Sequence, residues 1–350
     1  MPSPIPAAAA DSGIPSFAKA AMMNRRLFLA AAAVLPLPFC AIARAAMADK
    51  AEVQSFIDDV AKRHEFDADK LRGLFARLNV NHKVIKLMDA PAAKKVYWRD
   101  YRKNIMDPGR IKKGMDFMRR HKETLNRAEQ QYGIPPSVIA AIVGIETRYG
   151  DFLGNYGVME SLATLAFYYP RRADEFRREL EDFLLYARDA NINPLDLEGS
   201  FAGAFGMPQF LPGSARRFAV DFDYDDNIDL FSPADTIGSI GNFLDKHDWR
   251  REYGILYELE SIGDAKAMLA AGRDADYRPT FSLAGLRASG TRLKTAPRAN
   301  DEKYLLVDLP NETKTEYRAG TENFYALTRY NKSFKYAAAV FDLAAVLADS

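Results

Sequence analysis

The sequence predicts an α+β fold that is mainly helical, with a small sheet near the C-terminus. In residues 51–131, apolar residues recur at the spacing of one helix face, which is typical of amphipathic helices packed on a core. From about residue 277 to 330, short β-prone runs alternate with turn residues. A helical pattern returns at 335–348, so we expect helices on both sides of the sheet.

The clearest helical stripes and strand candidates support this fold class. The apolar spacing i, i+3, i+4, i+7 occurs twice near the start of the helical region, at Val53, Phe56, Ile57 and Val60 and again at Leu71, Leu74, Phe75 and Leu78. The β-prone runs cover 304–307 and 317–325. The resulting division is a leader at 1–45, a helical domain at 46–131, a core domain at 132–250, a small β domain at 251–331 and a C-terminal helix at 332–350 that packs back on the helical region.

Size and charge exclude some classes of function. The chain has 350 residues, 48% of them hydrophobic, so it can bury a sizeable core. Its net charge of +1 and the absence of long charge runs indicate no nucleic-acid partner. A nearly neutral protein that acts on a charged polymer recognises it through local contacts rather than through its overall field.

The N-terminus has the pattern of an export signal. Basic residues at 24–26 precede a short apolar stretch at 27–39, and residues 43–45 read Ala-Arg-Ala, which suits cleavage. The apolar stretch is too short to span a bilayer, and the paired arginines suggest the twin-arginine route. Phe39 precedes Cys40, the only cysteine, so we expect no lipid anchor and a mature, thiol-free periplasmic protein without a transmembrane span.

The segment 135–150 is the most informative part of the chain. Two prolines open it, ten residues without charge follow from 136 to 145, and then comes Glu146. Proline suits the first turn of a helix, and Gly150 marks its stop. Glu146 is therefore expected at the C-terminal end of an apolar helix, where the dipole and desolvation both raise a carboxyl pKa. A protonated glutamic acid can serve as a general acid; alternatively, Glu146 is a solvated helix-end residue.

Three segments in matching order carry a family resemblance. They are Gly-Ile-Glu-Thr-Arg-Tyr-Gly at 144–150, a Gly-x-x-Gly-x-x-Gln-Phe-x-Pro pattern at 203–212, and Asn-Phe-Tyr-Ala-Leu-Thr-Arg-Tyr-Asn-Lys-Ser-Phe-Lys-Tyr at 323–336. From about Val53 to its end the chain resembles the lytic transglycosylases of the membrane-bound B type, glycoside hydrolase family 103. These are lysozyme-fold enzymes that cleave peptidoglycan, and the resemblance implies a lysozyme-like core at 132–250.

The resemblance also implies a mechanism with a single catalytic carboxyl. Glu146 protonates the oxygen between N-acetylmuramic acid and N-acetylglucosamine, then accepts the proton of the muramoyl C6 hydroxyl, which closes a 1,6-anhydro ring. No cofactor is needed for catalysis, and peptidoglycan strands are the partner, with other cell-wall enzymes as further candidates. The substrate-binding residues implied are Tyr101, Arg171, Arg172, Ser200, Gln209, Phe210, Tyr330, Asn331 and Tyr336.

Two other functions remain open from the sequence. Glycosidases normally use two carboxylates, and Asp151 and Glu160 are near Glu146 in the chain, so a hydrolytic muramidase is one alternative. A catalytically silent peptidoglycan-binding protein is the other. One departure from the family concerns the cleft, where relatives carry a tyrosine and this chain has Phe243.

An acidic segment indicates a calcium site of the EF-hand kind. Acids occupy positions 1, 3, 5 and 9 of the loop that begins at Asp221, and alternating carboxylates suit a hard cation. Asp226 replaces the usual glycine at position 6, and Ser232 replaces the usual glutamate at position 12. The resembling family has a longer loop, whose last ligand lies fourteen residues after the first, and this position is Asp235 here. The resemblance therefore implies a structural Ca²⁺ bound by Asp221, Asp223, Asp225, the carbonyl of Asn227, and Asp235. The alternative is an acidic solvated turn.

Overall fold

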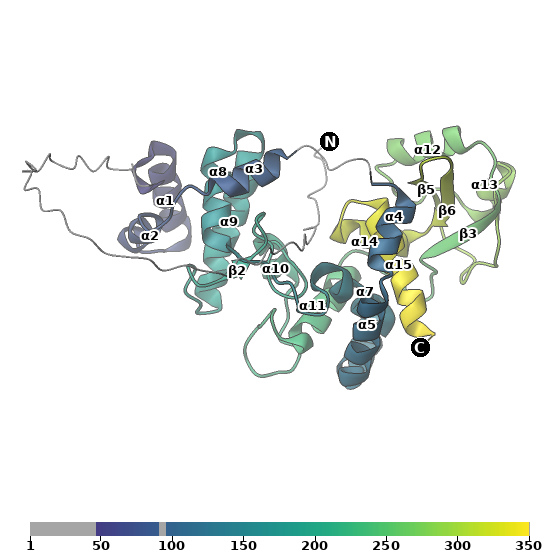
Figure 1. The fold of residues 1–350 in the computed structure, drawn as a ribbon, viewed down its shortest axis with the longest axis horizontal. Coiled ribbons are helices and arrows are strands. Elements are labelled where there is room, and N and C mark those ends of the chain that lie inside the picture. Colours follow the sequence, from purple (N-terminus) through teal and green to yellow (C-terminus); the bar gives the residue numbers. More distant parts are fainter. Residues whose placement is uncertain (1–46, 91–95, 350) are drawn as a thin grey trace, which may run out of the picture. The chain divides into compact units, whose positions relative to one another are not determined.

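The computed structural model describes residues 47–90 and 96–349 (Figure 1). These residues fall into two compact units, one ending at Leu78 and the other beginning at Asn79. The first unit contains η1 (Met47–Asp49), α1 (Ala51–His64) and α2 (Ala68–Phe75). The leader expected at 1–45 lies outside the described residues, and the other domain boundaries expected from the sequence remain predictions.

The second unit is mainly helical and holds every residue expected at the active site. Before the small sheet its elements are α3 (His82–Asp89), α4 (Trp98–Ile105), α5 (Pro108–Arg120), α6 (Lys122–Tyr132), α7 (Pro136–Thr147), β1 (Tyr156–Gly157), α8 (Val158–Tyr168), η2 (Pro170–Arg172), α9 (Ala173–Asp189), β2 (Glu198–Gly199), α10 (Pro212–Phe218) and α11 (Pro233–Asp245). The rest are β3 (Leu256–Ser261), α12 (Ala265–Asp274), α13 (Leu283–Ala288), β4 (Arg292–Leu293), β5 (Leu305–Pro310), β6 (Thr315–Gly320), α14 (Glu322–Tyr330) and α15 (Phe334–Ala348). This mixture confirms the mainly helical α+β class.

The small sheet has the order β4-β3-β6-β5, and all of its pairs are antiparallel. The helix α12 packs against β5, as Figure 1 shows beside the sheet. The buried residues of this region form a separate core made of Tyr257, Met268, Leu286, Tyr304, Leu306 and Ala319. The sheet thus has its own hydrophobic support, while α14 and α15 lead the chain back toward α7.

One predicted strand run extends too far. We expected β structure over 317–325, but the strand ends at Gly320 and α14 begins at Glu322. The hydroxyl oxygen of Thr321 accepts a hydrogen bond from the backbone N–H of Asn323 at 3.1 Å, which is the bond of a helix N-cap. The aromatic residues that suggested a strand therefore lie on a helix, because a capping residue directly precedes them.

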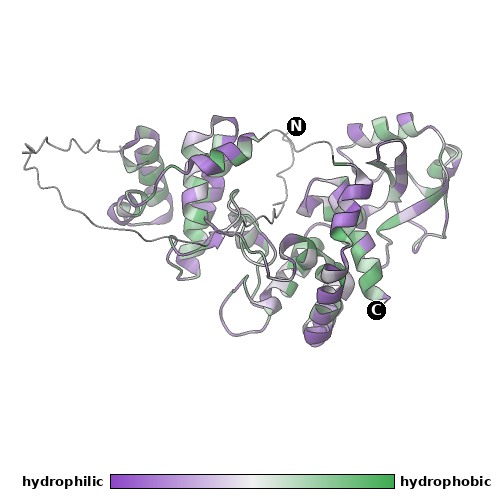
Figure 2. Ribbon diagram, in the orientation of Figure 1, coloured by the Kyte–Doolittle hydropathy of each residue, from purple (hydrophilic) through white to green (hydrophobic). Residues whose placement is uncertain are grey.

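The helix α7 is buried on nearly all sides. Residues 137–144 are all buried, and α5, α6, α11 and α15 pack around the helix. A helix that is hydrophobic all round belongs in the interior, which accounts for the ten uncharged residues of the sequence. In Figure 2, α15, which covers one side of α7, is largely hydrophobic. Glu146 is thus the only ionisable residue of α7, and it lies in the last turn.

The chain leaves α7 through a left-handed turn. Three successive residues have positive φ: Arg148 at 50°, Tyr149 at 63° and Gly150 at 93°. The N–H of Arg148 donates to the Gly144 carbonyl, and that of Tyr149 donates to the Val143 carbonyl, as in a Schellman-type ending. The helix ends at Thr147, so the left-handed conformation begins at Arg148, two residues before the glycine that marked the stop in the sequence.

The left-handed turn directs the Tyr149 side chain between two helices. A Cβ atom added to Gly114 of α5 would lie 2.3 Å from the Tyr149 hydroxyl, and one added to Gly144 of α7 would lie 2.4 Å from it. The two glycines therefore provide the space that the phenol fills.

Among the described residues, no helix is long and apolar enough to cross a membrane.

A methyl group at Gly144 is expected to disrupt this packing. Gly144→Ala would force the Tyr149 ring out of its place, and overpacking of this kind typically costs about 1–3 kcal/mol of unfolding free energy. Urea unfolding measures the loss. Gly272→Ala is the control, because nothing lies within 4 Å of a Cβ at that helical glycine; it should gain roughly 0.4–1 kcal/mol. Equal stability of the two variants would contradict the packing argument.

Candidate active site

Glu146 lies where α7 meets α15. The Tyr336 hydroxyl, in the first turn of α15, donates a hydrogen bond of 2.6 Å to Oε1 of Glu146. Burial raises the pKa of Glu146 from 4.5 to about 7, and the Tyr336 hydrogen bond partly offsets this rise. A carboxyl with this pKa is half protonated near neutral pH, so it can both donate and accept a proton there.

Three tyrosines surround the carboxyl. The rings of Tyr330 and Tyr336 are stacked with 6.3 Å between centroids and 9° between planes, and the Tyr330 hydroxyl donates to the Pro208 carbonyl at 2.6 Å. Burial, together with the charge of Glu146, raises the pKa of Tyr101 to about 12 and that of the other two tyrosines well above its ordinary value. All three phenols therefore remain protonated near neutral pH and are available as hydrogen-bond donors.

The glycine-rich segment makes internal bonds with the two polar residues predicted there. The Ser200 hydroxyl accepts from the Ala204 N–H at 3.0 Å. The Gln209 amide donates to the Leu153 carbonyl at 3.1 Å and to the Gly206 carbonyl at 2.8 Å. Gln209 itself has a φ of 50°, so its backbone is held in a left-handed conformation. These bonds fix the segment, and binding of substrate by either side chain remains a prediction.

Phe210 is part of a buried aromatic cluster. Only 3% of its surface is exposed, and its ring lies 5.6 Å from that of Phe243 and 5.7 Å from that of Tyr330. The Phe243 ring also stacks on His247 at 4.1 Å. The phenylalanine that departs from the family pattern is therefore packed between aromatic rings. Phe210 packs against Tyr330, and contact between Phe210 and a sugar remains a prediction.

The two predicted arginines already have carboxylate partners. The side chain of Arg171 is 75% exposed and lies 3.2 Å from Asp89. Arg172 holds Glu175 with both Nε and a terminal nitrogen, the former at 2.7 Å, and lies over the Phe176 ring. A substrate carboxylate would have to compete with these partners. Asn331 is the C-cap residue of α14, directly after Tyr330.

Sequence reasoning missed two residues that fix the end of α7. Arg110 is buried, and its guanidinium donates to the carbonyl of Gly144 at 3.1 Å and to that of Ile105 at 2.7 Å. The Thr147 hydroxyl makes 3.3 Å hydrogen bonds to the carbonyls of Val143 and Met207. Arg110 has no signal in its local sequence. Thr147 belongs to the first motif, but its contact with the glycine-rich segment depends on the fold.

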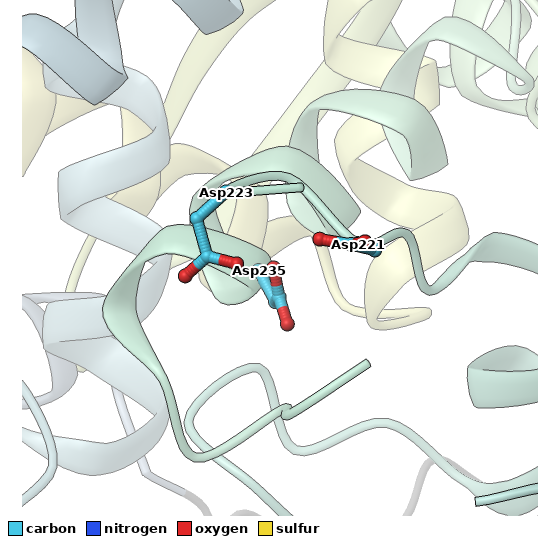
Figure 3. Close-up of side chains that lie close together, drawn as sticks. All are labelled: Asp221, Asp223 and Asp235. Atoms are coloured by element: carbon cyan, nitrogen blue, oxygen red, sulfur yellow. The ribbon is translucent and has the colours of Figure 1, made fainter. Parts of the chain in front are cut away.

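The acidic loop brings three of its predicted ligands together. Carboxylate oxygens of Asp221, Asp223 and Asp235 lie within 4.8 Å of one another, and Figure 3 shows the three side chains. Asp225 instead accepts from the Asn227 N–H at 2.9 Å. Asp226, which stands at the glycine position, has a φ of 66°. The loop therefore takes the left-handed turn that normally requires glycine, even though an aspartate is there.

Of the predicted ligands, Asp235 best fits a cation site, because it is buried and lies close to two other carboxylates. Only 1% of it is exposed, and its oxygens accept from the N–H groups of Phe222 and Asp229, both at 2.7 Å. Burial raises its pKa, and the charges of Asp223 and Asp221 raise it further. A divalent cation would relieve both effects.

The acidic loop is bonded to the active site through the Met207 peptide group and the Thr147 hydroxyl. The Leu230 carbonyl accepts from the Met207 N–H at 2.8 Å, and the Met207 carbonyl accepts from Thr147, the residue after Glu146. A Cβ at Gly206 would lie 2.7 Å from the Leu230 oxygen, so glycine is needed for this close approach. The conformation of the loop and that of the catalytic segment are therefore connected.

The raised pKa of Glu146 predicts a pH-dependent stability. Because its pKa is about 7 in the folded protein and near 4.5 when unfolded, the folded state loses stability as the pH rises between these values. Glu146→Gln removes this loss, so its unfolding free energy relative to the unmodified protein should rise by up to about 3 kcal/mol from pH 4 to pH 8. Urea unfolding at several pH values measures it.

Glu175→Gln provides a control with the opposite sign. The hydrogen bond from Arg172 lowers the pKa of Glu175, so its contribution to stability is present above about pH 4.5 and is lost as the pH falls. The variant should be the less stable protein at pH 7, with a difference that shrinks in acid. A pH-independent difference for Glu146→Gln would mean that its pKa is not raised.

Comparisons with known proteins identify the family of this chain. Residues 48–345 match the family described as Transglycosylase SLT domain. The membrane-bound lytic murein transglycosylase B of Escherichia coli is 37% identical over 314 residues, which cover 86% of this chain and 84% of that protein. The crystal structure of the soluble lytic transglycosylase SltB1 from Pseudomonas aeruginosa matches with a TM-score of 0.77 and 38% identity, covering 85% of this chain and 98% of that one.

Two further structures were solved with bound species. The Escherichia coli lytic transglycosylase Slt35 in complex with calcium matches with a TM-score of 0.75 and 37% identity, covering 84% of this chain and 92% of that one. The Pseudomonas aeruginosa protein SltB3 in complex with NAG-anhNAM-pentapeptide matches with a TM-score of 0.72 and 26% identity, covering 84% and 78%. The chain belongs to the Transglycosylase SLT domain family, whose matched members are lytic transglycosylases with a lysozyme-like fold.

Proposed function

We propose that this protein is a peptidoglycan lytic transglycosylase with Glu146 as its single catalytic acid and base. The observation that carries the proposal is the half-buried carboxyl at the end of α7, which has a pKa of about 7 and a hydrogen bond from Tyr336. Family membership and the relatives named murein transglycosylase support the substrate class.

In the proposed reaction, Glu146 first donates a proton to the substrate and then accepts one from it. Protonated Glu146 donates to the glycosidic oxygen, the bond from that oxygen to C1 of the muramoyl residue breaks, and N-acetylglucosamine leaves with a free 4-hydroxyl. An oxocarbenium-like or oxazolinium species remains. The Glu146 carboxylate then takes the proton of the C6 hydroxyl as that oxygen attacks C1, which gives the 1,6-anhydro end and restores the acid. Neither water nor a redox cofactor is consumed.

Two observations favour this mechanism over hydrolysis. Among the described residues, the hydrogen-bond partner of the Glu146 carboxyl is the Tyr336 phenol and not a second acid. Of the acids close to it in sequence, Asp151 pairs with Lys113 and Glu160 accepts from the Asn81 amide at 2.8 Å. A nucleophile supplied by the substrate removes the need for a second carboxyl.

The other site residues have proposed roles in binding the glycan. Tyr336 and Tyr101 orient the carboxyl through their protonated phenols, and Tyr330 forms an aromatic wall beside them. Ser200, Gln209 and Asn331 bind sugar substituents, while Arg171 and Arg172 bind the lactyl or peptide carboxylates. We also propose that the leader at 1–45 directs the chain to the periplasm, where peptidoglycan and other cell-wall enzymes are the partners.

Product analysis tests the function. The protein without its leader, incubated with purified peptidoglycan, should release muropeptides that are lighter than the hydrated forms by one water. Glu146→Gln should lower the rate by at least about 100-fold, because general acid–base catalysis contributes on this scale. Mass spectrometry of the soluble products distinguishes the alternatives: reducing ends would indicate a muramidase, and sedimentation with peptidoglycan without any product would indicate a binding protein.

We further propose that the acidic loop binds a structural Ca²⁺ ion through Asp221, Asp223 and Asp235, with Asp225 and the Asn227 carbonyl completing the shell. The convergence of three carboxylates and the buried position of Asp235 support this. Calcium in a related structure supports the choice of ion. The ion would stabilise the loop and take no part in the reaction.

Calcium should therefore raise the melting temperature. Saturation at 100 times the Kd corresponds to about 2.7 kcal/mol of added stability, so calcium in place of a chelator should shift Tm by several degrees. Asp223→Asn should abolish most of the shift. Asp226→Asn is the matched control, because Asp226 is exposed and lies outside the cluster; loss of the shift in both variants would indicate nonspecific charge screening.

A further inference from the structure

The tyrosines beside Glu146 come from two different helices. Tyr336 of α15 donates a hydrogen bond of 2.6 Å to Glu146. Tyr101 lies in α4, which packs on α15, and the charge of Glu146 adds to burial in raising its pKa. Glu146 lies in a third helix, α7. The geometry of the site therefore depends on the positions of α4 and α15 relative to α7.

The buried face of α15 combines alanines with larger apolar side chains. The helix α15 packs on α7, and its buried residues include Ala337, Ala338, Ala339 and Ala344. Val340, Leu343 and Leu347 are buried with them. Apolar packing is not directional, so polar bonds to α15 add a specific constraint on its position.

One buried carboxylate connects α15 with the two elements beside it. Asp342 of α15 is buried; its Oδ1 accepts from a terminal nitrogen of Arg318 at 2.6 Å, and its Oδ2 accepts from the other at 3.3 Å. The same Oδ2 accepts from Nε of Arg102. Arg318 belongs to β6, and Arg102 follows Tyr101 in α4. Asp342 thus connects both tyrosine-bearing helices to the sheet.

A second carboxylate holds the start of α4. Nε of Arg318 donates to Glu316 at 2.7 Å, and the Trp98 indole N–H donates to the other oxygen of Glu316 at 3.0 Å. Trp98 is the first residue of α4 and is 1% exposed. Both ends of the segment 98–102 are therefore bonded to this network, and Tyr101 lies between them.

The network is balanced in charge. It contains the guanidinium groups of Arg102 and Arg318 and the carboxylates of Asp342 and Glu316. Glu258, paired with Arg318 in the sheet register, is exposed and bound to Lys294 instead. Loss of the Asp342 charge would remove the partner that Arg318 and Arg102 share, which would weaken the connection among the three elements.

We propose that Asp342, together with Arg318 and Arg102, is a positioning residue that holds α4 and α15 where Tyr101 and Tyr336 meet Glu146. The proposal rests on the catalytic role proposed for Glu146. Asp342 does not touch substrate. It acts through the two tyrosines, so its loss should change both the titration of Glu146 and the rate of the chemical step.

Two variants test this, with a matched control. The variants are Asp342→Asn and Arg102→Lys, and the second is the milder because the Arg102 side chain is 46% exposed. Each should lower kcat by on the order of 10-fold to 100-fold, because small misplacements of catalytic groups have effects of this size. KM should change little. The control is Glu302→Gln, another buried carboxylate, which accepts from Tyr257 and Tyr304 in the small sheet. It should lower Tm and leave kcat unchanged well below that Tm.

A double-mutant cycle and a titration separate positioning from stability. In a Tyr336→Phe background, Asp342→Asn should lower kcat several-fold less than in the unmodified protein. Infrared titration of the Glu146 carboxyl, identified by its absence in Glu146→Gln, should show a higher pKa in Asp342→Asn, because the bond from Tyr336 that stabilises the carboxylate is lost. An unchanged pKa, or equal loss of kcat in both backgrounds, would overturn the proposal. The titration does not require enzymatic activity. It therefore tests the positioning role of Asp342 even if the product analysis contradicts the proposed function.

Discussion

The hydrogen bond between Tyr336 and Glu146 sets the protonation behaviour of the candidate active site. It requires a carboxyl at the end of a buried helix and a phenol from a segment 190 residues later in the chain. Burial alone would keep Glu146 protonated, and full exposure would keep it ionised. The phenol stabilises the ionised form of the half-buried carboxyl, so both protonation states are accessible near neutral pH.

The segments around Glu146 are joined by hydrogen bonds that centre on the Met207 peptide group. The Met207 peptide contacts Leu230 on one side and Thr147 on the other, so the acidic loop, the glycine-rich segment and the catalytic helix share one chain of bonds. Within the loop, the Asp221 carboxylate accepts from the backbone N–H groups of Tyr224, Asp225 and Asp226, and Asp235 accepts from two more. These bonds hold the loop although Asp226 and Ser232 depart from the standard pattern.

The sequence was sufficient for the parts of the fold that depend on local pattern. The uncharged run before Glu146 predicted the buried helix, the aspartate spacing predicted the acidic cluster, and the apolar stripes predicted the mainly helical class. The strand expected through residue 325 was wrong, because the capping bond of Thr321 outweighed the β preference of the aromatic residues that follow. Asp342 could not have been identified, since an aspartate in a helix is usually solvated, and its partners at 102 and 318 meet it only in the folded chain.

The Tyr149 side chain has a consequence for how this chain can diverge. Its phenol occupies the volume that Cβ atoms of Gly114 and Gly144 would fill, so the three positions share a single volume. A larger residue at either glycine is tolerated only if residue 149 becomes smaller at the same time, and a smaller residue 149 leaves a cavity unless a glycine is replaced. In homologous chains these positions should therefore covary as a set, and a redesign of the catalytic helix has to treat them as one unit.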